Sequence, residues 1–253
     1  MNATAIALIV FACVFCGAIA GMFLNPRLPD HHLAGTSSDV VKLIIGLIGT
    51  MAALVLGLLV ASAKGTYDTQ TSEVAQLSAS IIELDRILAN YGPDTKEART
   101  SLRQTVVEAA ERIWPRDSSV SPNLELFRNK AEPEVFFRDI QALSPQTDEQ
   151  RYIKSEALQI TTGIYHTRLL MYSQRSSAIA LPFLIVLVSW LVLLFVGFGL
   201  LTRFNGTVVT ALLIGALSVA GAIFLILELD QPYTGFMRVS SAPIEAALTQ
   251  MSQ

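Results

Sequence analysis

Two carboxylates close the last long apolar run of the chain, in the stretch LELDQPYTGF (227–236). Glu228 and Asp230 stand where a membrane helix would end and present its carbonyl groups, which form the negative end of the helix dipole. Because carboxylates are unfavourable there, we expect a basic partner, and Lys64 and Arg175 are predicted at the same depth. The acids are interpreted as an interfacial ion-pair lock. The alternative is a ring of carboxylates at a pore mouth, or a cation site.

A sharp turn is expected directly after these acids. Pro232 lacks a backbone donor and cannot continue a normal helix, and Gly235 permits a turn. Tyr233 and Phe236 are aromatic residues of the kind that anchor at a membrane interface. The chain is therefore expected to bend at the membrane surface.

The second apolar run carries two neighbouring stripes at helical spacing. One stripe is small and the other bulky, and they consist of Gly46, Thr50, Ala53, Gly57 and Ala61, and of Leu47, Met51, Leu54 and Leu58. Small residues let a neighbouring helix approach closely, which is the preferred interpretation of the small stripe and of Gly17 and Gly21 in the first run. In a ring of subunits, one stripe would face a central pore, with the bulky residues forming a hydrophobic constriction.

Catalytic and metal-binding motifs are missing from the sequence. Cys13 and Cys16 have CxxC spacing, but they lie in an apolar run and are interpreted as packing residues. His31 and His32 are adjacent, so they cannot both point at one ion from a helix or strand. No nucleophile elbow, phosphate loop or metalloprotease pair occurs. We therefore expect no enzymatic activity, no cofactor and no metal.

Hydrophobic residues make up 52% of the 253 residues and charged residues only 15%, where about a quarter is usual in soluble domains. Four runs contain no Asp, Glu, Lys or Arg, and each is long enough to cross about 30 Å of hydrocarbon as a helix. The expected helices cover about 3–24, 43–63, 177–201 and 207–228. The sequence thus predicts an all-α polytopic membrane protein in a lipid bilayer.

The charges exclude two classes of function. The net charge is −3, and no basic face suited to nucleic acid is present. The apolar runs contain no ionisable side chain at depth, which argues against a proton-coupled or ion-coupled transporter. The first run has no preceding Lys or Arg and is longer than a usual signal core, so we expect a membrane helix there.

The polar region between the second and third runs is expected to form a helical bundle in water. Its first helix has a heptad seam of Val74, Leu77, Ile81, Leu84, Leu88 and Tyr91. A second helix is predicted over about 95–114 and a third from near Thr147, with short helical pieces between them. Gly65 is the only breaker before the first seam, so the second membrane helix should continue into the bundle. The expected domains are a hairpin (1–64), the bundle (65–175), a second hairpin (176–228) and a C-terminal tail (229–253).

Several stretches resemble the bestrophin-like domain family of four-helix bacterial membrane proteins. They are GLLVASAKGTYDTQTSEV (57–74), LDRILANYGPDTKEAR (84–99), IWP (113–115) and ELDQPYTGFMRVSSAPI (228–244). The layout also resembles the bestrophin anion channels, which implies a homo-oligomer, a pentamer by analogy. Two departures are clear: the second run has no aromatic residue between Lys42 and Lys64, and too few acids follow the fourth run to support calcium gating.

The leading hypothesis is a passive ion channel, with an anion as the ion and the second helix lining the pore. The alternative is a non-conducting membrane scaffold or signalling subunit whose bundle binds a partner. The resemblance places the protein in a bacterial inner membrane. Both hairpin loops are short, so the N-terminus, bundle and C-terminus are expected on one side, and the excess of Lys and Arg near the membrane there favours the cytoplasm.

Overall fold

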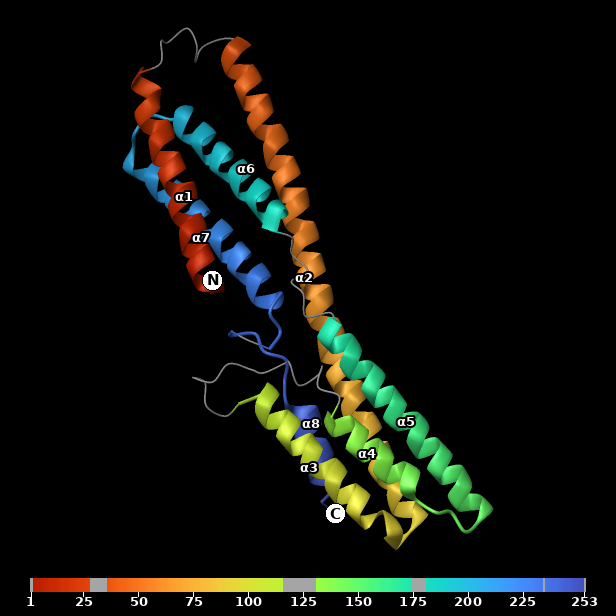
Figure 1. Ribbon diagram of the computed structural model, residues 1–253. Coiled ribbons are helices and arrows are strands. Elements are labelled where there is room, and N and C mark those ends of the chain that lie inside the picture. Colours follow the sequence, from red (N-terminus) through yellow and green to blue (C-terminus); the bar gives the residue numbers. More distant parts are fainter. Residues whose placement is uncertain (1, 28–35, 116–130, 174–180, 234, 253) are drawn as a thin grey trace. The chain divides into compact units, whose positions relative to one another are not determined.

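The computed structural model describes residues 2–27, 36–115, 131–173, 181–233 and 235–252. Figure 1 shows the helices, which are α1 (Ala3–Leu24), α2 (Thr36–Tyr91), α3 (Lys96–Ile113), α4 (Ala131–Ala142), α5 (Asp148–Ser173), α6 (Leu181–Leu200), α7 (Gly206–Leu229) and α8 (Ala242–Gln250). Single turns of 3-10 helix occur at Asn25–Arg27 and Pro93–Thr95. No strand occurs in these five ranges, so the all-α prediction is confirmed.

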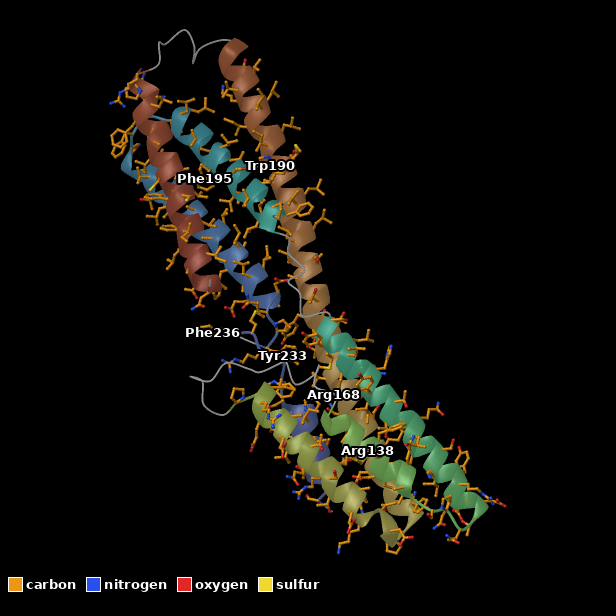
Figure 2. All side chains as sticks on the ribbon, viewed as in Figure 1. Arg138, Arg168, Trp190, Phe195, Tyr233 and Phe236 are labelled. Carbon is orange, nitrogen blue, oxygen red and sulfur yellow. The ribbon has the colours of Figure 1, made fainter. Side chains whose placement is uncertain are left out.

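The chain divides into two compact units. The membrane unit comprises Met1–Thr66 and Ser177–Gln231, and the bundle unit comprises Tyr67–Ser176 and Pro232–Gln253. Among the described residues, four helices are long and apolar enough to cross a membrane, namely α1, α2, α6 and α7. This confirms the four predicted spans. Figure 2 shows the contrast in composition, because nitrogen and oxygen atoms cluster along α3, α4 and α5 and are sparse along α1, α6 and α7.

The membrane unit is held together by close packing of α1 against α6 and α7. A Cβ atom on Gly21 would collide with the backbone carbonyl of Val196, and one on Gly199 would collide with the carbonyl of Ala18. Helices α1 and α6 therefore touch backbone to backbone, which glycine allows because it has no Cβ atom. The interpretation of Gly17 and Gly21 as close-packing residues is confirmed.

The bundle unit buries the predicted seam of α2 completely. All six seam residues are less than 9% exposed, and Ala98, Leu102, Val106 and Ile113 of α3 pack into the same core with Ala157 and Met171 of α5. Helix α4 adds Phe136 and Ile140. The Thr147 hydroxyl accepts a hydrogen bond from the Gln150 amide at 3.1 Å, so the predicted N-terminal cap of α5 is confirmed.

A tight turn joins α2 to α3. Gly92 has a φ of 122°, which favours glycine. The Thr95 hydroxyl donates to the carbonyls of Leu88 at 2.5 Å and Gly92 at 2.8 Å. Beyond the turn, Arg99 makes two parallel hydrogen bonds of 2.8 Å to the Asp85 carboxylate. The forked ion pair therefore joins α2 to α3 close to the turn.

The end of the chain belongs to the bundle unit rather than forming a loose tail. Val239, Ile244, Ala247 and Met251 are all buried in the bundle core. The sequence pattern predicted no helix over Ala242–Gln250. Helix α8 there is only nine residues long. So short a helix is stabilised by tertiary packing and not by its own propensity.

Candidate pore-lining helix and acidic helix end

The apolar half of α2 packs on α6 through one face only. Gly49 faces Leu194 on α6, and a Cβ atom built on Gly197 of α6 would lie 2.5 Å from the Ile45 Cδ1. Ala52 and Ala63 are buried in the same core. This face of α2, which we call the α6-facing side, therefore consists of residues near 45, 49, 52, 56 and 63, where Leu56 is partly buried against the same core.

The predicted pore-lining stripe lies on the opposite side of α2. Its members follow positions 45, 49, 52 and 56 by two residues, and two residues turn an α-helix by about 200°. Their exposed fractions are 61%, 45%, 67% and 64% for Leu47, Met51, Leu54 and Leu58. The described part of the chain therefore leaves all four side chains largely uncovered.

The small stripe lies on a flank of the same helix. It follows the α6-facing side by about one residue, or about 100°. All five of its residues are exposed, and a Cβ atom on Gly46 or Gly57 would meet nothing within 4 Å. No described residue packs against Gly46 or Gly57, so this stripe is available to a helix of another chain.

Burial separates α2 from the other membrane helices. Only 11% of its most apolar window is buried, against 33%, 39% and 22% for α1, α6 and α7. The free energy of transferring such a surface to water is large, at about 25 cal/mol per Å². The apolar half of α2 therefore requires lipid or another protein surface around it.

Glu228 and Asp230 are both buried at the end of α7, with exposed fractions of 7% and 8%. The backbone finishes the helix there, since the Asp230 amide donates to the Ile226 carbonyl at 3.1 Å. Lys64 is exposed. Lys64 and both acids each have an interaction partner. Arg175, the other predicted partner, lies outside the described residues.

A closed loop follows the acids. Gly235 has a φ of 81°, and the Val239 amide donates to the Pro232 carbonyl at 2.7 Å. Arg238 Nε donates to the Gly235 carbonyl at 3.0 Å. Phe236, labelled in Figure 2, is 92% exposed, as an interfacial anchor would be.

Comparison with known proteins identifies the family. A family model described as the Bestrophin-like domain matches residues 12–244. The chain belongs to the Bestrophin-like family. This membership and the four apolar helices make it an integral membrane protein.

Similar folds occur among solved structures. A bacterial bestrophin homolog from Klebsiella pneumoniae, carrying a mutation, has a TM-score of 0.72 at 11% sequence identity, and the alignment covers 99% of this chain and 97% of that one. A second variant of that homolog gives a TM-score of 0.70 at 11% identity, with 96% and 97% covered. At this identity the likeness concerns the fold alone. A search of curated proteins found no significant match.

The stretches that carry the family resemblance meet in the bundle unit. The Tyr233 hydroxyl donates to Gln70 Oε1 at 2.6 Å, and the Tyr233 ring lies edge-on to Trp114, 6.2 Å between centroids. Trp114 Nε1 donates to the Val239 carbonyl at 2.9 Å. Burial raises the pKa of the Tyr233 hydroxyl, and the Glu73 carboxylate raises it further.

This cluster corrects one expectation for the Bestrophin-like chain. Tyr233 was expected at the membrane interface, but it is only 5% exposed because its ring and hydroxyl are both used inside the bundle unit. Sequence analysis also missed the Asp85–Arg99 pair. Its signal was available, since Asp85 directly follows a seam residue and Arg99 lies just beyond the Gly92–Pro93 break.

Metal binding finds no support in the parts of the chain that the structure covers. No group of three or more His, Cys, Asp or Glu side chains gathers in those ranges. Cys13 and Cys16 are both free thiols on α1. His31 and His32 lie outside the described residues.

Proposed function

We propose that this Bestrophin-like protein is a passive ion channel, built as a homo-oligomeric ring in which α2 of each subunit lines the axis. The observation that carries the proposal is the apolar half of α2, of which only 11% is buried within the chain and on which the small stripe is fully exposed. A ring of subunits covers such a surface, because each α2 then meets copies of itself.

The two stripes fit different surfaces of such a ring. The bulky stripe lies opposite the α6-facing side and would point at the axis, where Leu47, Leu54 and Leu58 narrow the path. The small stripe lies on the flank, where the exposed Gly46 and Gly57 would let the neighbouring subunit approach closely. The pore interpretation and the packing interpretation then apply to different stripes of one helix.

The proposed ion is an anion. The bulky stripe offers no fixed charge, so passage would depend on how readily an ion sheds water in an apolar constriction. Large, weakly hydrated anions pay the smallest such cost. The bestrophin-like layout supports the same assignment and, by analogy, five subunits, in a bacterial inner membrane with the bundle in the cytoplasm.

The acids at the end of α7 are assigned to structure in this proposal. Glu228 and Asp230 are buried within their own subunit, which supports an ion-pair lock rather than a hydrated ring at a pore mouth. Lys64 and Arg175 are the proposed basic partners. Neutralising the acids should then weaken assembly or folding without changing ion selectivity.

A non-conducting scaffold or signalling subunit is the second candidate. It is favoured by neighbouring apolar side chains on one face of α5, where Tyr165 is 36% exposed and Leu169, four residues later, is 45% exposed. These side chains would suit a protein partner. In this case the α2 surface would be covered without enclosing a conducting path.

Ion flux from proteoliposomes distinguishes the two candidates. The intact protein is compared under chloride and potassium gradients with Leu54→Ala, the double variant Glu228→Gln/Asp230→Asn, and Leu217→Ala. Leu217 is the matched control, because it is a 60% exposed leucine on α7. The channel proposal predicts chloride flux that changes with Leu54→Ala and not with Leu217→Ala. No flux from assembled oligomers, across several pH values and voltages, would contradict it.

A further inference from the structure

The loop between α7 and α8 combines a buried base with an exposed tip. At the base, Tyr233 and Val239 are 5% and 1% exposed. The Val239 amide donates to the Pro232 carbonyl at 2.7 Å, which closes the loop. At the tip, Phe236 and Met237 are 92% and 38% exposed, although each has an interaction partner. The function proposed above makes no use of this tip.

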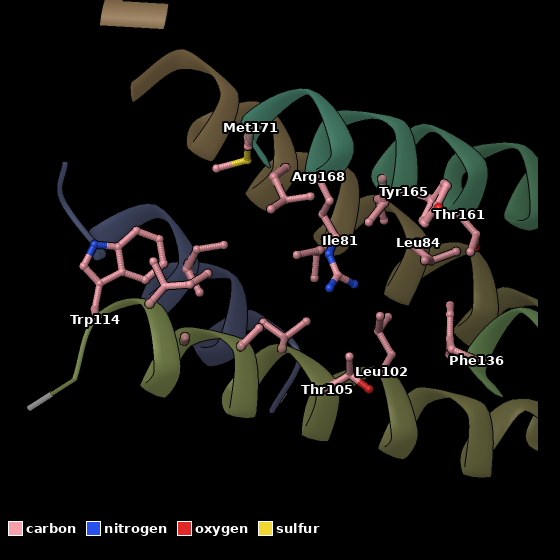
Figure 3. Close-up of a pocket in the computed structure, with 17 residues that line it drawn as sticks. Ile81, Leu84, Leu102, Thr105, Trp114, Phe136, Thr161, Tyr165, Arg168 and Met171 are labelled. Atoms are coloured by element: carbon pink, nitrogen blue, oxygen red, sulfur yellow. The ribbon is translucent and has the colours of Figure 1, made fainter. Parts of the chain in front are cut away.

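Trp114 holds the base of the loop at both ends. Figure 3 shows this side chain at one end of the apolar lining of the bundle core. Its Nε1 donates to the Val239 carbonyl at 2.9 Å, and its ring lies edge-on to Tyr233, with 6.2 Å between the ring centroids. Because both ends of the loop are fixed in the bundle core, the apolar tip is presented from a firm base.

The tip lies close along the chain to the ends of two membrane spans. Gly235 follows Leu229, the last residue of α7, by six residues, which extend over about 20 Å at most. The Arg238 carbonyl accepts a hydrogen bond from the Tyr67 hydroxyl at 3.4 Å. Tyr67 follows Ala63, the last residue of the uncharged run of α2, by four residues or about 6 Å of helix. Because the headgroup layer extends about 5–8 Å beyond the hydrocarbon, the tip is expected in this layer.

Arg238 gives the tip a positive charge. Its side chain is exposed, and its Nε donates to the Gly235 carbonyl at 3.0 Å. A guanidinium carries five N–H donors, and no described residue accepts a hydrogen bond from the other four. The nearest acids in the chain, Glu228 and Asp230, are buried. Asp68, at the start of the bundle half of α2, is exposed but has an interaction partner. The tip therefore offers apolar surface and a cation that can bind a phosphate.

We propose that this loop tip binds an anionic glycerophospholipid at the membrane surface. Phe236 and Met237 enter the region between the headgroups and the acyl chains, where aromatic rings are favoured. The Arg238 guanidinium donates to the lipid phosphate, and the net charge of the headgroup selects an anionic lipid over a zwitterionic one. A bilayer surface matches the apolar tip, the cation and the position beside two spans together. The assignment does not depend on whether the protein conducts ions.

Quenching by brominated lipid tests insertion and lipid preference together. Phe236→Trp places a fluorophore at the tip, where the 92% exposure of the parent residue leaves room for it. Trp190→Phe removes the tryptophan of α6, and the Trp190→Phe protein alone measures the background from Trp114. The full-length protein is placed in nanodiscs with increasing mole fractions of brominated phosphatidylglycerol or brominated phosphatidylcholine. Both lipids carry bromine on acyl carbons near the headgroup, where it quenches tryptophan fluorescence at short range.

Three variants in this background separate the charge from the structure of the loop. Arg238→Gln removes the charge, and Arg238→Lys keeps the charge but loses the planar fork that holds the Gly235 carbonyl. Arg103→Gln is the matched control for loss of an arginine, because Arg103 is exposed on α3, outside the loop. Thermal melting of each variant checks that it is folded.

We expect both lipids to quench the tip fluorescence, with half-maximal quenching at about a fivefold lower mole fraction of the anionic lipid. Arg238→Gln should remove this preference, Arg238→Lys should retain most of it, and Arg103→Gln should leave it unchanged. The proposal is overturned if neither lipid quenches the tip, which would place it in water or against another subunit. It is also overturned if the two lipids quench alike before Arg238 is changed, or if Arg238→Gln keeps the preference.

Discussion

In its second half, within the bundle unit, α2 buries Val74, Leu84 and Leu88 completely, whereas in its first half, within the membrane unit, Leu54 and Leu58 are more than 60% exposed. Both halves carry apolar side chains at regular helical spacing. The apolar side chains of the bundle half are covered by α3, α5 and α8 of the same chain. Those of the membrane half are left largely uncovered by the described residues.

The difference shows that apolar periodicity alone does not say what will cover a helix face. In water, an exposed seam would cost free energy, so the chain supplies its own cover. In a membrane, lipid already solvates apolar side chains, and association depends on close packing of small residues. The small stripe beside Leu54 and Leu58 is therefore the feature that points to assembly.

The largest expected effect comes from the backbone contact inside the membrane unit. Gly21→Leu should destabilise the fold by about 3 kcal/mol or more, because its side chain would have to displace the backbone of α6. Loss of a monodisperse peak in size-exclusion chromatography, with a lowered melting temperature, would report it. Normal melting of Gly21→Leu would show that α1 and α6 are not in backbone contact.

The ion pair at the turn tests the self-contained half of α2. Arg99→Met leaves the Asp85 carboxylate buried without its forked partner and should cost about 2–3 kcal/mol, reduced from a fully buried pair because Arg99 is 34% exposed. Thermal melting measures the loss. The double variant Asp85→Leu/Arg99→Met should recover part of it, and an equal or larger loss in the double variant would contradict the assignment.

Tyr233 gives a smaller effect and a pH dependence. Tyr233→Phe removes the hydrogen bond to Gln70 and should cost about 1 kcal/mol. Because burial raises the pKa of this hydroxyl above its ordinary value of 10.0, the folded state keeps the proton that the unfolded state releases. The contribution is present below about pH 10 and is lost as pH rises above it. Melting from pH 8 to 11 should show a shallower alkaline decline in Tyr233→Phe than in the parent protein.

The smallest effect on chain stability, and a large effect on assembly, is expected on the small stripe. Gly57→Leu places its side chain in open space within the subunit, so the membrane unit, to which Gly57 belongs, should lose no stability of its own. In the proposed ring the leucine would instead separate neighbouring α2 helices. Chemical cross-linking in membranes should then show smaller oligomers than in the parent protein. Unchanged oligomers would place the small stripe against lipid.

The sequence predicted much of the fold because its signals are local. Uncharged runs marked the four spans, and the seam from Val74 to Tyr91 marked the buried face of α2. The break at Gly92–Pro93 and the cap at Thr147 placed two helix ends within a residue or two. Each of these features depends on neighbouring residues and the solvent, not on distant parts of the chain.

The site was less predictable because it depends on distant contacts. Tyr233 and Gln70 are 163 residues apart, and no local pattern reveals their hydrogen bond. Helix α8 is too short to stand out from its own composition. The stripes on α2 were visible in the sequence, but which of them the chain leaves uncovered follows only from how α2 packs on α6.

The central claim is that the bulky stripe of α2 faces a hydrated path. We would introduce Leu54→Cys into a Cys13→Ser/Cys16→Ser background and follow chloride flux from proteoliposomes during treatment with a charged, membrane-impermeant thiol reagent. Leu217→Cys on α7 is the matched control. The thiolate attacks the reagent only where water reaches the cysteine. We therefore predict that the cysteine at position 54 is modified and that chloride flux is blocked. Neither is expected at position 217. If the cysteine at position 54 is protected like the one at position 217 and flux is unaffected, the axis is not lined by this stripe.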